Sequence, residues 1–401
     1  MSVPGAERTA PQQADGQAAP RPESDDDILI RVENVVKHFP VKSMGFTRRT
    51  VGQVHAVDDV SLVVERGKTL GLVGETGSGK STLARCVAGL IPVTSGKVFL
   101  DGTDITRLSR SAMRPLRRQV QMIFQDPYSS LNPRRRVGAI IGDPFSIHKT
   151  ATGAERKRMV QELMERVGLN PEHFNRFPAE FSGGQRQRIG VARALALRPK
   201  LIICDEPVSA LDVSIQAQVL NLLSDLQQEY GLSYLFIAHD LEVVRHVSDK
   251  VAVMYLGRIG EAAPADVLYT TPQHPYTVAL LSAAPAADPD SAAARQRIIL
   301  TGDVPSPIDP PAGCRFHPRC PKAQPICGVE EPPLVPHELR AGPAADGSPD
   351  AGASPTAADV PGGEAHVTAC HFPVSPGESL VTAGAGAAGT AANGAGKGES
   401  A

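Results

Sequence analysis

Several features are scarce in this chain of 401 residues. It contains no tryptophan and only 4% aromatic residues, and neither charge is in excess, since 41 Lys and Arg stand against 43 Asp and Glu. A near-neutral chain is not typical of a dedicated nucleic-acid-binding protein, which carries a clear basic excess. No run approaches the roughly 18 to 20 apolar residues that cross a bilayer, and residues 1–27 lack the apolar core of a signal peptide. The composition therefore favours a soluble cytoplasmic protein that acts at a membrane only with the help of partners.

Glycine and proline, by contrast, are abundant, with 37 and 35 residues. Much of the excess lies in three stretches without hydrophobic periodicity, at 1–27, 341–365 and 374–401. Such segments cannot bury enough apolar surface to offset the entropy lost on ordering. We therefore predict that all three are disordered. The foldable part runs from about 28 to 336, with a short outpost at 367–373.

Buried strands and helices alternate along the middle of the chain. Four apolar runs lack polar alternation, which is typical of parallel strands buried on both faces. These runs are Thr69–Val73, Val120–Phe124, Leu201–Cys204 and Leu235–Ala238. Helical patterns occur at 80–89, 185–197 and 215–229. The alternation predicts a mixed sheet covered by helices.

Two further regions complete this outline. Between Leu29 and Leu72, β-branched and polar residues alternate and are interrupted by glycine and proline, which predicts short strands. The stretch from Pro127 to Phe181 is mostly helical and lies between two of the buried strands. We expect it to form a separate helical lobe.

A phosphate-loop pattern, Gly74-Glu-Thr-Gly-Ser-Gly-Lys-Ser81, follows the strand that ends at Val73 and begins a helix at Lys80. The glycines let backbone N–H groups point inward around the β-phosphate, and the helix N-terminus adds a favourable dipole. Lys80 would reach the β- and γ-phosphate oxygens, and the Ser81 hydroxyl would bind Mg²⁺. The expected nucleotide ligands here are Gly74, Thr76, Gly77, Ser78, Gly79, Lys80, Ser81 and Thr82.

Two adjacent carboxylates, Asp205 and Glu206, end the buried strand that begins at Leu201. We expect Asp205 to lie beside the phosphate loop, where it can hold Mg²⁺ through water. Glu206 points the other way and can orient and polarise an attacking water. Two like charges side by side are costly unless a cation or a substrate uses them.

With these motifs in place, the chain resembles the ATP-binding-cassette (ABC) ATPases. Phe181-Ser-Gly-Gly-Gln185 is similar to the family signature, with Phe where Leu is commonest. A Ser-Gly-Gly turn that caps a helix is a second anion site. The resemblance implies a head-to-tail dimer, in which each ATP lies between the phosphate loop of one subunit and the signature of the other. The signature residues expected to bind that nucleotide are Ser182, Gly183, Gly184 and Gln185.

Four more residues match ABC positions by their order and spacing. Gln125 matches the glutamine that couples Mg²⁺ and the attacking water to the transport subunits, which implies both a catalytic and a metal-binding role. His239 matches the switch histidine that contacts the γ-phosphate, and Asp212 lies in the inter-subunit loop. Phe39 falls where the family stacks an aromatic ring on adenine, although Tyr is commoner there and the neighbouring His38 competes for the role.

The resemblance implies an α/β P-loop NTPase fold of the ABC cassette type, with a mixed sheet core, an antiparallel β subdomain and a helical subdomain. We expect the cassette at 28–270, with the helical subdomain at about 127–190. A cysteine-containing C-terminal extension would follow at 271–373, between disordered tails at 1–27 and 374–401.

Three segments are similar to the peptide-importer ATPases of the OppF/DppF type: Phe124–Pro133, Asp205–Gln218 and His274–Thr277. This implies a subunit that binds ATP and Mg²⁺ and hydrolyses ATP to power the import of oligopeptides or dipeptides. The implied partners are a paralogous ABC ATPase, two permease subunits and an extracytoplasmic peptide-binding protein, without nucleic acid. The chain would then lie on the cytoplasmic face of the membrane.

Other functions within the same superfamily stay open. Importers of nickel or glutathione use similar ATPases, so the motor is better defined than the cargo. An exporter ATPase is disfavoured by the His274-Pro-Tyr segment. A non-transport ABC ATPase usually carries two cassettes or a long coiled-coil insertion, and the chain has neither.

Four of the six cysteines, Cys314, Cys320, Cys327 and Cys370, lie beyond the cassette. Disulfides are disfavoured in a reducing cytoplasm, so the clustering suggests a metal. Their intervals fit neither a tight zinc pattern nor the common ferredoxin runs, although thiolates suit both kinds of site. Three alternatives stay open: an iron–sulfur cluster of the 4Fe–4S type, a zinc ion, or free buried thiols. His317 and His371 are spare ligand candidates, and Cys86 and Cys204 are interpreted as core residues.

Overall fold

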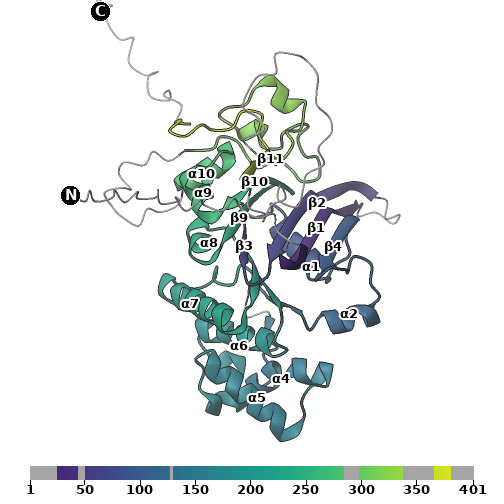
Figure 1. The fold of residues 1–401 in the computed structure, drawn as a ribbon, viewed down its shortest axis with the longest axis vertical. Coiled ribbons are helices and arrows are strands. Elements are labelled where there is room, and N and C mark those ends of the chain that lie inside the picture. The colour runs from purple at the N-terminus through teal and green to yellow at the C-terminus, as the bar shows by residue number, and fades with distance from the viewer. Residues whose placement is uncertain (1–24, 44–49, 127–129, 284–297, 337–364, 381–401) are drawn as a thin grey trace, which may run out of the picture.

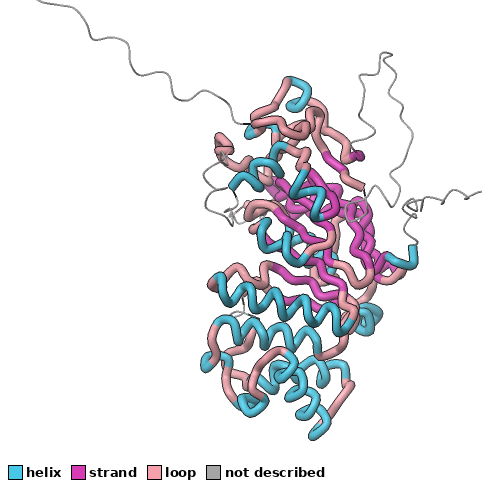
Figure 2. Tube along the Cα trace, turned by 60° about the vertical axis from the view of Figure 1, so that its left-hand side comes forward, coloured by secondary structure: helices cyan, strands magenta, loops and turns pink. Residues whose placement is uncertain are grey.

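The computed structural model describes residues 25–43, 50–126, 130–283, 298–336 and 365–380 (Figures 1 and 2). Most of the predicted disordered segments lie outside these ranges, so disorder at 1–24 and 381–401 stays a prediction. The C-terminal extension continues past the boundary expected at residue 373, since Val374 and Leu380 are both buried. A three-residue 3₁₀ helix, η1 (Asp25–Asp27), begins it.

The central sheet has eight strands in the order β11–β12–β10–β9–β3–β8–β7–β6. Neighbours from β9 to β6 are parallel, whereas β10, β12 and β11 pair antiparallel. The strands are β3 (Thr69–Val73), β6 (Val120–Ile123), β7 (Leu201–Asp205), β8 (Ser233–Ala238), β9 (Lys250–Tyr255), β10 (Arg258–Pro264), β11 (Val335–Pro336) and β12 (Val367–Thr368). The four predicted runs are the strands β3, β6, β7 and β8. Burial is confirmed along the whole of β3, β7 and β8, whereas β6 ends at Ile123, is half-buried at Gln121 and Met122, and is followed by an exposed Phe124.

Side chains of these strands enter two separate cores, because they alternate between the faces of the sheet. On β7, Ile202 and Cys204 pack into the core beneath the helices. Leu201 and Ile203 pack into the core beneath a second, antiparallel sheet. Both faces are dry, which explains why the strands carry no polar alternation.

Helices cover one face of the sheet and extend into a separate lobe (Figure 1). That face is covered by α6 (Gly183–Leu195), α7 (Val213–Tyr230) and α8 (Leu241–Val247). Two more helices, α4 (Val137–His148) and α5 (Gly153–Arg166), pack with α6 and with η2 (Pro171–Asn175), and η3 (Pro178–Glu180) precedes α6. The predicted helical lobe is therefore present. Three residues of the segment that resembles the peptide-importer ATPases lie outside the described residues: Pro127, Tyr128 and Ser129.

The second sheet has the order β2–β1–β4–β5 and packs with α1 (Lys80–Val87) and α2 (Arg110–Leu116) on the other face. Its strands are β1 (Ile28–Lys42), β2 (Thr50–Glu65), β4 (Ser95–Leu100) and β5 (Thr103–Asp104). The prediction of short strands is wrong here, since β1 and β2 have 15 and 16 residues. Pro40 does not end β1, because β4 pairs with β1 only as far as Val36 and leaves Pro40 on a free edge.

The C-terminal extension folds back onto the cassette and completes its main sheet. α9 (Ala265–Thr270) precedes it, and it contains α10 (Pro275–Ala283), η4 (His317–Arg319) and η5 (Pro325–Gly328). β12 pairs with β10, and Val367 is fully buried there, as the predicted outpost requires. Within the described ranges, no helix has both the length and the apolarity needed to cross a membrane.

Candidate functional site

The loop from Gly74 to Gly79 joins β3 to α1 and lies tightly against neighbouring backbone. A Cβ atom at Gly79, where φ is +107°, would lie 2.0 Å from the carbonyl oxygen of Ala56. A Cβ atom at Gly74 would lie 2.0 Å from the carbonyl oxygen of Met254. Only glycine fits at these two positions, and the loop N–H groups are thereby held ahead of the α1 N-terminus, where an anion binds.

Lys80, the first residue of α1, folds back over this loop. Its Nζ donates hydrogen bonds to the carbonyl oxygens of Gly74 at 2.7 Å and Glu75 at 2.9 Å. Burial lowers the pKa of Lys80, although the nearby charges of Glu206 and Asp205 favour its protonated form. The ammonium group is therefore held at the loop, ready to take a phosphate oxygen in place of a carbonyl.

The remaining predicted loop residues divide by exposure. Thr76 and Gly77 are exposed on the outer side of the loop, and Ser81 and Thr82 are half-buried on α1. Ser78 is buried, and its backbone N–H donates to the Glu75 carbonyl oxygen at 3.1 Å. The loop is thus open on one side and anchored on the other.

Asp205, at the end of β7, lies beside α1. The Ser81 hydroxyl donates a hydrogen bond to its Oδ1 at 2.6 Å, as expected for a hydroxyl and a carboxylate that share one cation. The Asp205 side chain is buried, and burial raises its pKa despite the hydrogen bond from Ser81. Mg²⁺ prefers oxygen ligands, and Ser81, Asp205 and the amide oxygen of Gln125 are a donor set that fits it.

Glu206 meets residues from two other strand ends. Gln125, just after β6, donates from Nε2 to Glu206 Oε2 at 2.8 Å. His239, just after β8, places Nδ1 3.4 Å from the same oxygen. Glu206 is only 8% exposed and has a φ of +47°, a conformation that non-glycine residues rarely adopt. Such strain is typical of functional sites, and here it turns Glu206 away from Asp205.

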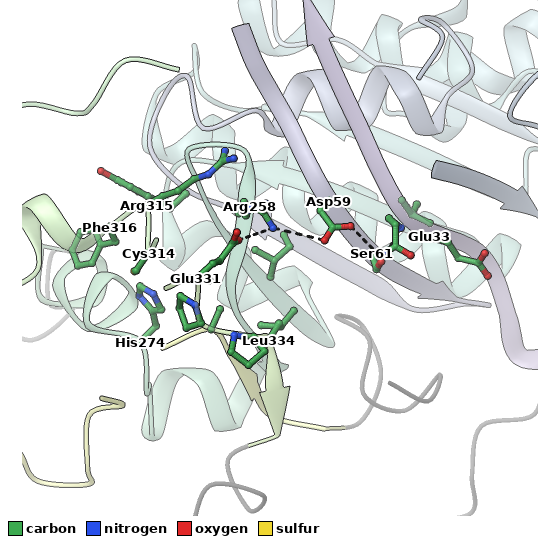
Figure 3. A pocket seen from close by; sticks show the side chains of 18 of the residues that line it. Glu33, Asp59, Ser61, Arg258, His274, Cys314, Arg315, Phe316, Glu331 and Leu334 are labelled. Atoms are coloured by element: carbon green, nitrogen blue, oxygen red, sulfur yellow. Dashed lines mark hydrogen bonds and ion pairs between the residues drawn. The ribbon is translucent and has the colours of Figure 1, made fainter. Parts of the chain in front are cut away.

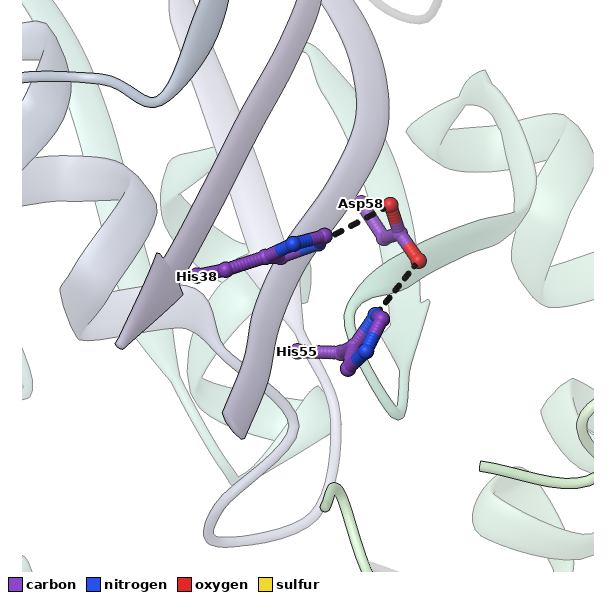
Figure 4. Close-up of side chains that lie close together, drawn as sticks. All are labelled: His38, His55 and Asp58. Carbon is purple, nitrogen blue, oxygen red and sulfur yellow. Dashed lines mark hydrogen bonds and ion pairs between the residues drawn. The ribbon is translucent and has the colours of Figure 1, made fainter. Parts of the chain in front are cut away.

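The predicted base-stacking residue, Phe39, lies on β1 and is 38% exposed. Its neighbour His38 is engaged elsewhere (Figure 4), because Nε2 lies 3.2 Å from Asp58 Oδ1 and the ring packs 4.0 Å from the ring of His55. Asp58 also lies 3.3 Å from His55 Nδ1. Phe39 is therefore the freer of the two candidate rings.

The signature lies on a different element from the phosphate loop. Ser182 caps α6, since its Oγ accepts the Gln185 N–H at 3.3 Å and Gln185 Oε1 accepts the Ser182 N–H at 3.0 Å. A Cβ atom at Gly184 would lie 2.4 Å from Ile215, so glycine is required there. α6 packs on α4, α5, α7 and β6, whereas α1 packs on β1, β2, β7 and β8. Asp212 is exposed at the start of α7.

The four cysteines of the extension line one small pocket. Cys314, Cys320, Cys327 and Cys370 surround it, together with His317 and His371. Burial raises the pKa of Cys320 to about 11, so its thiol is protonated in the absence of a metal. Cys86 and Cys204 are buried on α1 and β7, as expected of core residues.

A zinc ion requires a close spacing of the sulfur atoms at this pocket. Four sulfurs bound to one zinc ion at about 2.3 Å would lie about 3.8 Å apart. Within the described ranges, the three-ligand groups with atoms inside 4.8 Å of one another do not include these cysteines. Four thiols are a donor set that both an iron–sulfur cluster and a zinc ion accept, so the residues present fit either kind of site.

Glu75, in the phosphate loop, is held by two residues that the sequence patterns did not single out. Tyr276 OH accepts the Glu75 N–H at 2.9 Å, and Arg319 Nη1 lies 3.1 and 3.0 Å from the two carboxylate oxygens. Tyr276 belongs to the His274-Pro-Tyr segment, which resembles the peptide-importer ATPases. This resemblance was the only sequence feature that pointed to Tyr276. Arg319 left no signal in the sequence.

The extension also faces the antiparallel sheet across a cavity of about 920 Å³ (Figure 3). Arg258 lies between Glu331 and Asp59 there, at 2.6 and 3.7 Å. Arg315, at the edge of the cavity, forms an ion pair with Asp58. Ion pairs therefore join the extension to β2, directly through Arg315 and through Arg258 of β10.

Two family models match the chain. The ABC transporter model matches residues 57–209, which include the phosphate loop, the signature and the two carboxylates. The model of the oligopeptide/dipeptide transporter C-terminal region matches residues 261–327. The second match contains Tyr276, Arg319 and three of the pocket cysteines.

Individual proteins are similar over most of the chain. The oligopeptide transport ATP-binding protein AppF of Bacillus subtilis (strain 168) is 52% identical over 310 residues, which cover 77% of this chain and 94% of AppF. The di/tripeptide transport ATP-binding protein DppF of Pseudomonas aeruginosa (strain UCBPP-PA14) is 50% identical over 308 residues, with the same coverage. A dimeric, post-hydrolysis structure of the ATP-binding cassette MJ0796 with ADP and Pi superposes with a TM-score of 0.53 at 27% identity and covers 59% of this chain and 99% of that one. The chain therefore belongs to the ATP-binding subunits of ABC transporters, in the branch that carries the oligopeptide/dipeptide transporter C-terminal region.

Proposed function

We propose that this chain is the ATP-hydrolysing subunit of an importer that carries oligopeptides or dipeptides across the cytoplasmic membrane. The observation that carries the proposal is the meeting of three strand ends, which brings Gln125 and His239 onto Glu206 while Asp205 lies on Ser81. The similarity to AppF and DppF over most of their length supports peptides as the cargo.

Each residue of the site has a role in hydrolysis. The loop N–H groups and Lys80 bind the phosphates, and Phe39 stacks on the base. Ser81, Asp205 and Gln125 hold Mg²⁺, which when bound neutralises charge that develops on the γ-phosphate. Glu206 orients the attacking water and accepts its proton, and His239 contacts the γ-phosphate.

The chain would work as half of a dimer. Its phosphate loop and its signature lie on different elements, α1 and α6, and each presents an open anion site. We propose that a paralogous cassette supplies the signature to this chain's ATP and receives Ser182, Gly183, Gly184, Gln185 and Asp212 in return. Two permeases would hold the pair at the cytoplasmic face of the membrane, and an extracytoplasmic binding protein would deliver the peptide.

Glu206→Gln tests the catalytic assignment, since it keeps the size of the side chain and removes the base. We expect nucleotide affinity close to that of the wild type, a loss of hydrolysis of about 100-fold or more, and an ATP-bound dimer that stays closed in size-exclusion chromatography. Glu229→Gln, at an exposed ion pair with Arg166, is the matched control and should leave hydrolysis unchanged. Hydrolysis by Glu206→Gln near the wild-type rate refutes the assignment.

The cargo is tested in vesicles that contain this chain, its partner cassette and both permeases. Binding protein loaded with a peptide should stimulate ATP hydrolysis and peptide uptake. Stimulation by nickel or by glutathione, with none by peptides, would replace the peptide assignment with one of those cargoes.

We also propose that Cys314, Cys320, Cys327 and Cys370 hold a 4Fe–4S cluster. When bound, the cluster supplies four metal–thiolate bonds that tie three separate segments of the extension together. Anaerobic purification should give a brown protein with iron–sulfur absorption and about four irons per chain, and Cys370→Ser should lose both signals while Cys86→Ala keeps them. A colourless, metal-free wild-type protein would refute the cluster, and zinc in its place would reassign the site.

A further inference from the structure

The C-terminal extension contacts Glu75 of the phosphate loop from two described elements: α10, through Tyr276, and the 314–320 loop, which contains η4, through Arg319. Arg319 of this loop is only 10% exposed at its side chain, and its Nη1 bridges both carboxylate oxygens of Glu75 at 3.0 and 3.1 Å. Its Nη1 also lies 3.4 Å from the Tyr255 hydroxyl, and a guanidinium stays protonated in proteins. The guanidinium is therefore a fixed positive charge beside the loop.

The ion pair between Arg319 and Glu75 also places a positive charge beside a carboxylate near the expected phosphate site. The Glu75 carbonyl accepts a hydrogen bond from Lys80 Nζ at 2.9 Å, so the Glu75 carboxylate belongs to a residue that the phosphate-binding lysine contacts. An unpaired carboxylate at this position would repel the polyphosphate, since two unit charges interact over several ångströms inside a protein. Arg319 neutralises that carboxylate and fixes its direction.

The surroundings of Arg319 make its position rigid. Tyr255, Tyr276 and Phe316 form an aromatic cluster with ring centroids 4.7 to 5.3 Å apart. Tyr276 is fully buried and accepts the Glu75 backbone N–H. Glu75 is thus held by Arg319 at its side chain and by Tyr276 of α10 at its backbone, and both contacts join the extension to the phosphate loop.

Arg319 also bears a cost that stability alone does not explain. Its Nε is buried and has no hydrogen-bond partner within the described part of the chain. An unsatisfied buried donor costs free energy, and such a group calls for a functional explanation. The orientation that leaves Nε unpaired is the one that directs Nη1 onto Glu75.

We propose that Arg319 is a positioning residue for ATP binding, which acts through Glu75 to hold the phosphate loop in its receptive form. This inference rests on the proposed function, because it requires the loop to bind ATP. It gives the C-terminal extension a direct role in nucleotide affinity. The role is separate from contact with substrate, since the Arg319 side chain bonds to Glu75 and Tyr255.

A double-mutant cycle tests the proposal on the full-length chain. Dissociation constants for Mg-ATP are measured by displacement of a fluorescent ATP analogue from the wild type, Arg319→Gln, Glu75→Gln and the double variant. We expect Arg319→Gln to weaken binding at least fivefold, and Arg319→Lys to restore part of the loss. In the Glu75→Gln background, Arg319→Gln should change affinity by less than twofold, because there is no carboxylate left to hold.

Controls separate this proposal from general destabilisation and from the proposed function. Lys322→Gln, which removes a nearby ion pair with Glu378, should leave affinity unchanged. In the assembled transporter, Arg319→Gln should raise the KM for ATP and keep kcat within twofold. Unchanged affinity in Arg319→Gln, or an equal loss with and without Glu75, overturns the positioning role. If Arg319→Gln fails to fold, unchanged affinity in Arg319→Lys and Glu75→Gln overturns it instead. A wild-type chain that binds no ATP overturns the proposed function itself.

Discussion

Ser81 and Asp205 are 124 residues apart in the sequence, yet the Oγ of one lies 2.6 Å from the Oδ1 of the other. The hydrogen bond joins the first turn of α1 to the end of β7 at the place where Mg²⁺ is expected. Asp205 is buried, so its carboxylate is poorly solvated and its pKa is raised. A bound cation would stabilise the charged form of this carboxylate.

Replacing this carboxylate should uncouple ATP binding from the metal. We expect Mg²⁺ to raise ATP affinity in the wild type and to have little effect in Asp205→Asn, because the amide carries no charge for the ion. Titration of Mg²⁺ at a fixed nucleotide analogue concentration measures the difference. Asp143→Asn, at an exposed pair with Arg135, should behave as the wild type. A normal Mg²⁺ response in Asp205→Asn would contradict the metal assignment.

Lys80→Ala should weaken nucleotide binding by more than tenfold. The lysine is 4% exposed and is the cation nearest to the loop carbonyls, so its loss removes the main charge that faces the phosphates. Equilibrium binding of a fluorescent nucleotide measures the effect. Lys68→Ala removes an exposed lysine paired with Asp249 and serves as the control. Equal affinity in Lys80→Ala and the wild type would show that the loop binds phosphate without it.

Gly71 and Gly190 should respond oppositely to the same substitution. On β3, a Cβ atom at Gly71 would lie 2.3 Å from Val244 Cγ1 on α8, so Gly71→Ala should destabilise the protein by about 1–3 kcal/mol through overpacking. At Gly190, inside α6, a Cβ atom meets nothing within 4 Å, and Gly190→Ala should add about 0.5–1 kcal/mol of helix stability. Urea unfolding measures both. A neutral Gly71→Ala would mean that α8 shifts freely over β3.

Asp58 should contribute a pH-dependent part of the stability. Burial alone would raise its pKa, but Arg315, His55 and Arg258 outweigh burial and hold the pKa below the ordinary value of 3.8. A lowered pKa in the folded state stabilises the protein above pH 3.8, and this stability is lost as the pH falls through the folded-state pKa. Asp58→Asn should therefore be less stable at pH 7 and should lose less stability between pH 5 and pH 3.

Urea midpoints at several pH values measure this difference. Asp225→Asn, on the exposed side of α7, is the control, and its pH profile should follow that of the wild type. Parallel profiles for Asp58→Asn and the wild type would contradict a lowered Asp58 pKa.

Local pattern was enough for four of the eight strands of the central sheet and for the phosphate loop. Unbroken apolar runs mark β3, β7 and β8 because strands buried on both faces have no position that tolerates water. The glycines, Lys80 and Ser81 are adjacent in sequence, so their arrangement follows from a strand, a turn and a helix start. The lengths of β1 and β2 were misjudged, because Pro40 is compatible with a strand when one of its edges is free.

The sequence by itself determined the buried strands β3, β7 and β8, the phosphate loop and the order of the charged residues at the strand ends. Only the tertiary structure brought Gln125 and His239 to Glu206, four cysteines to one pocket, and Arg319 to Glu75 across 244 residues. The physical reason is range: helix and turn preferences act over a few neighbours, whereas these contacts depend on which strands pair and on where the extension packs.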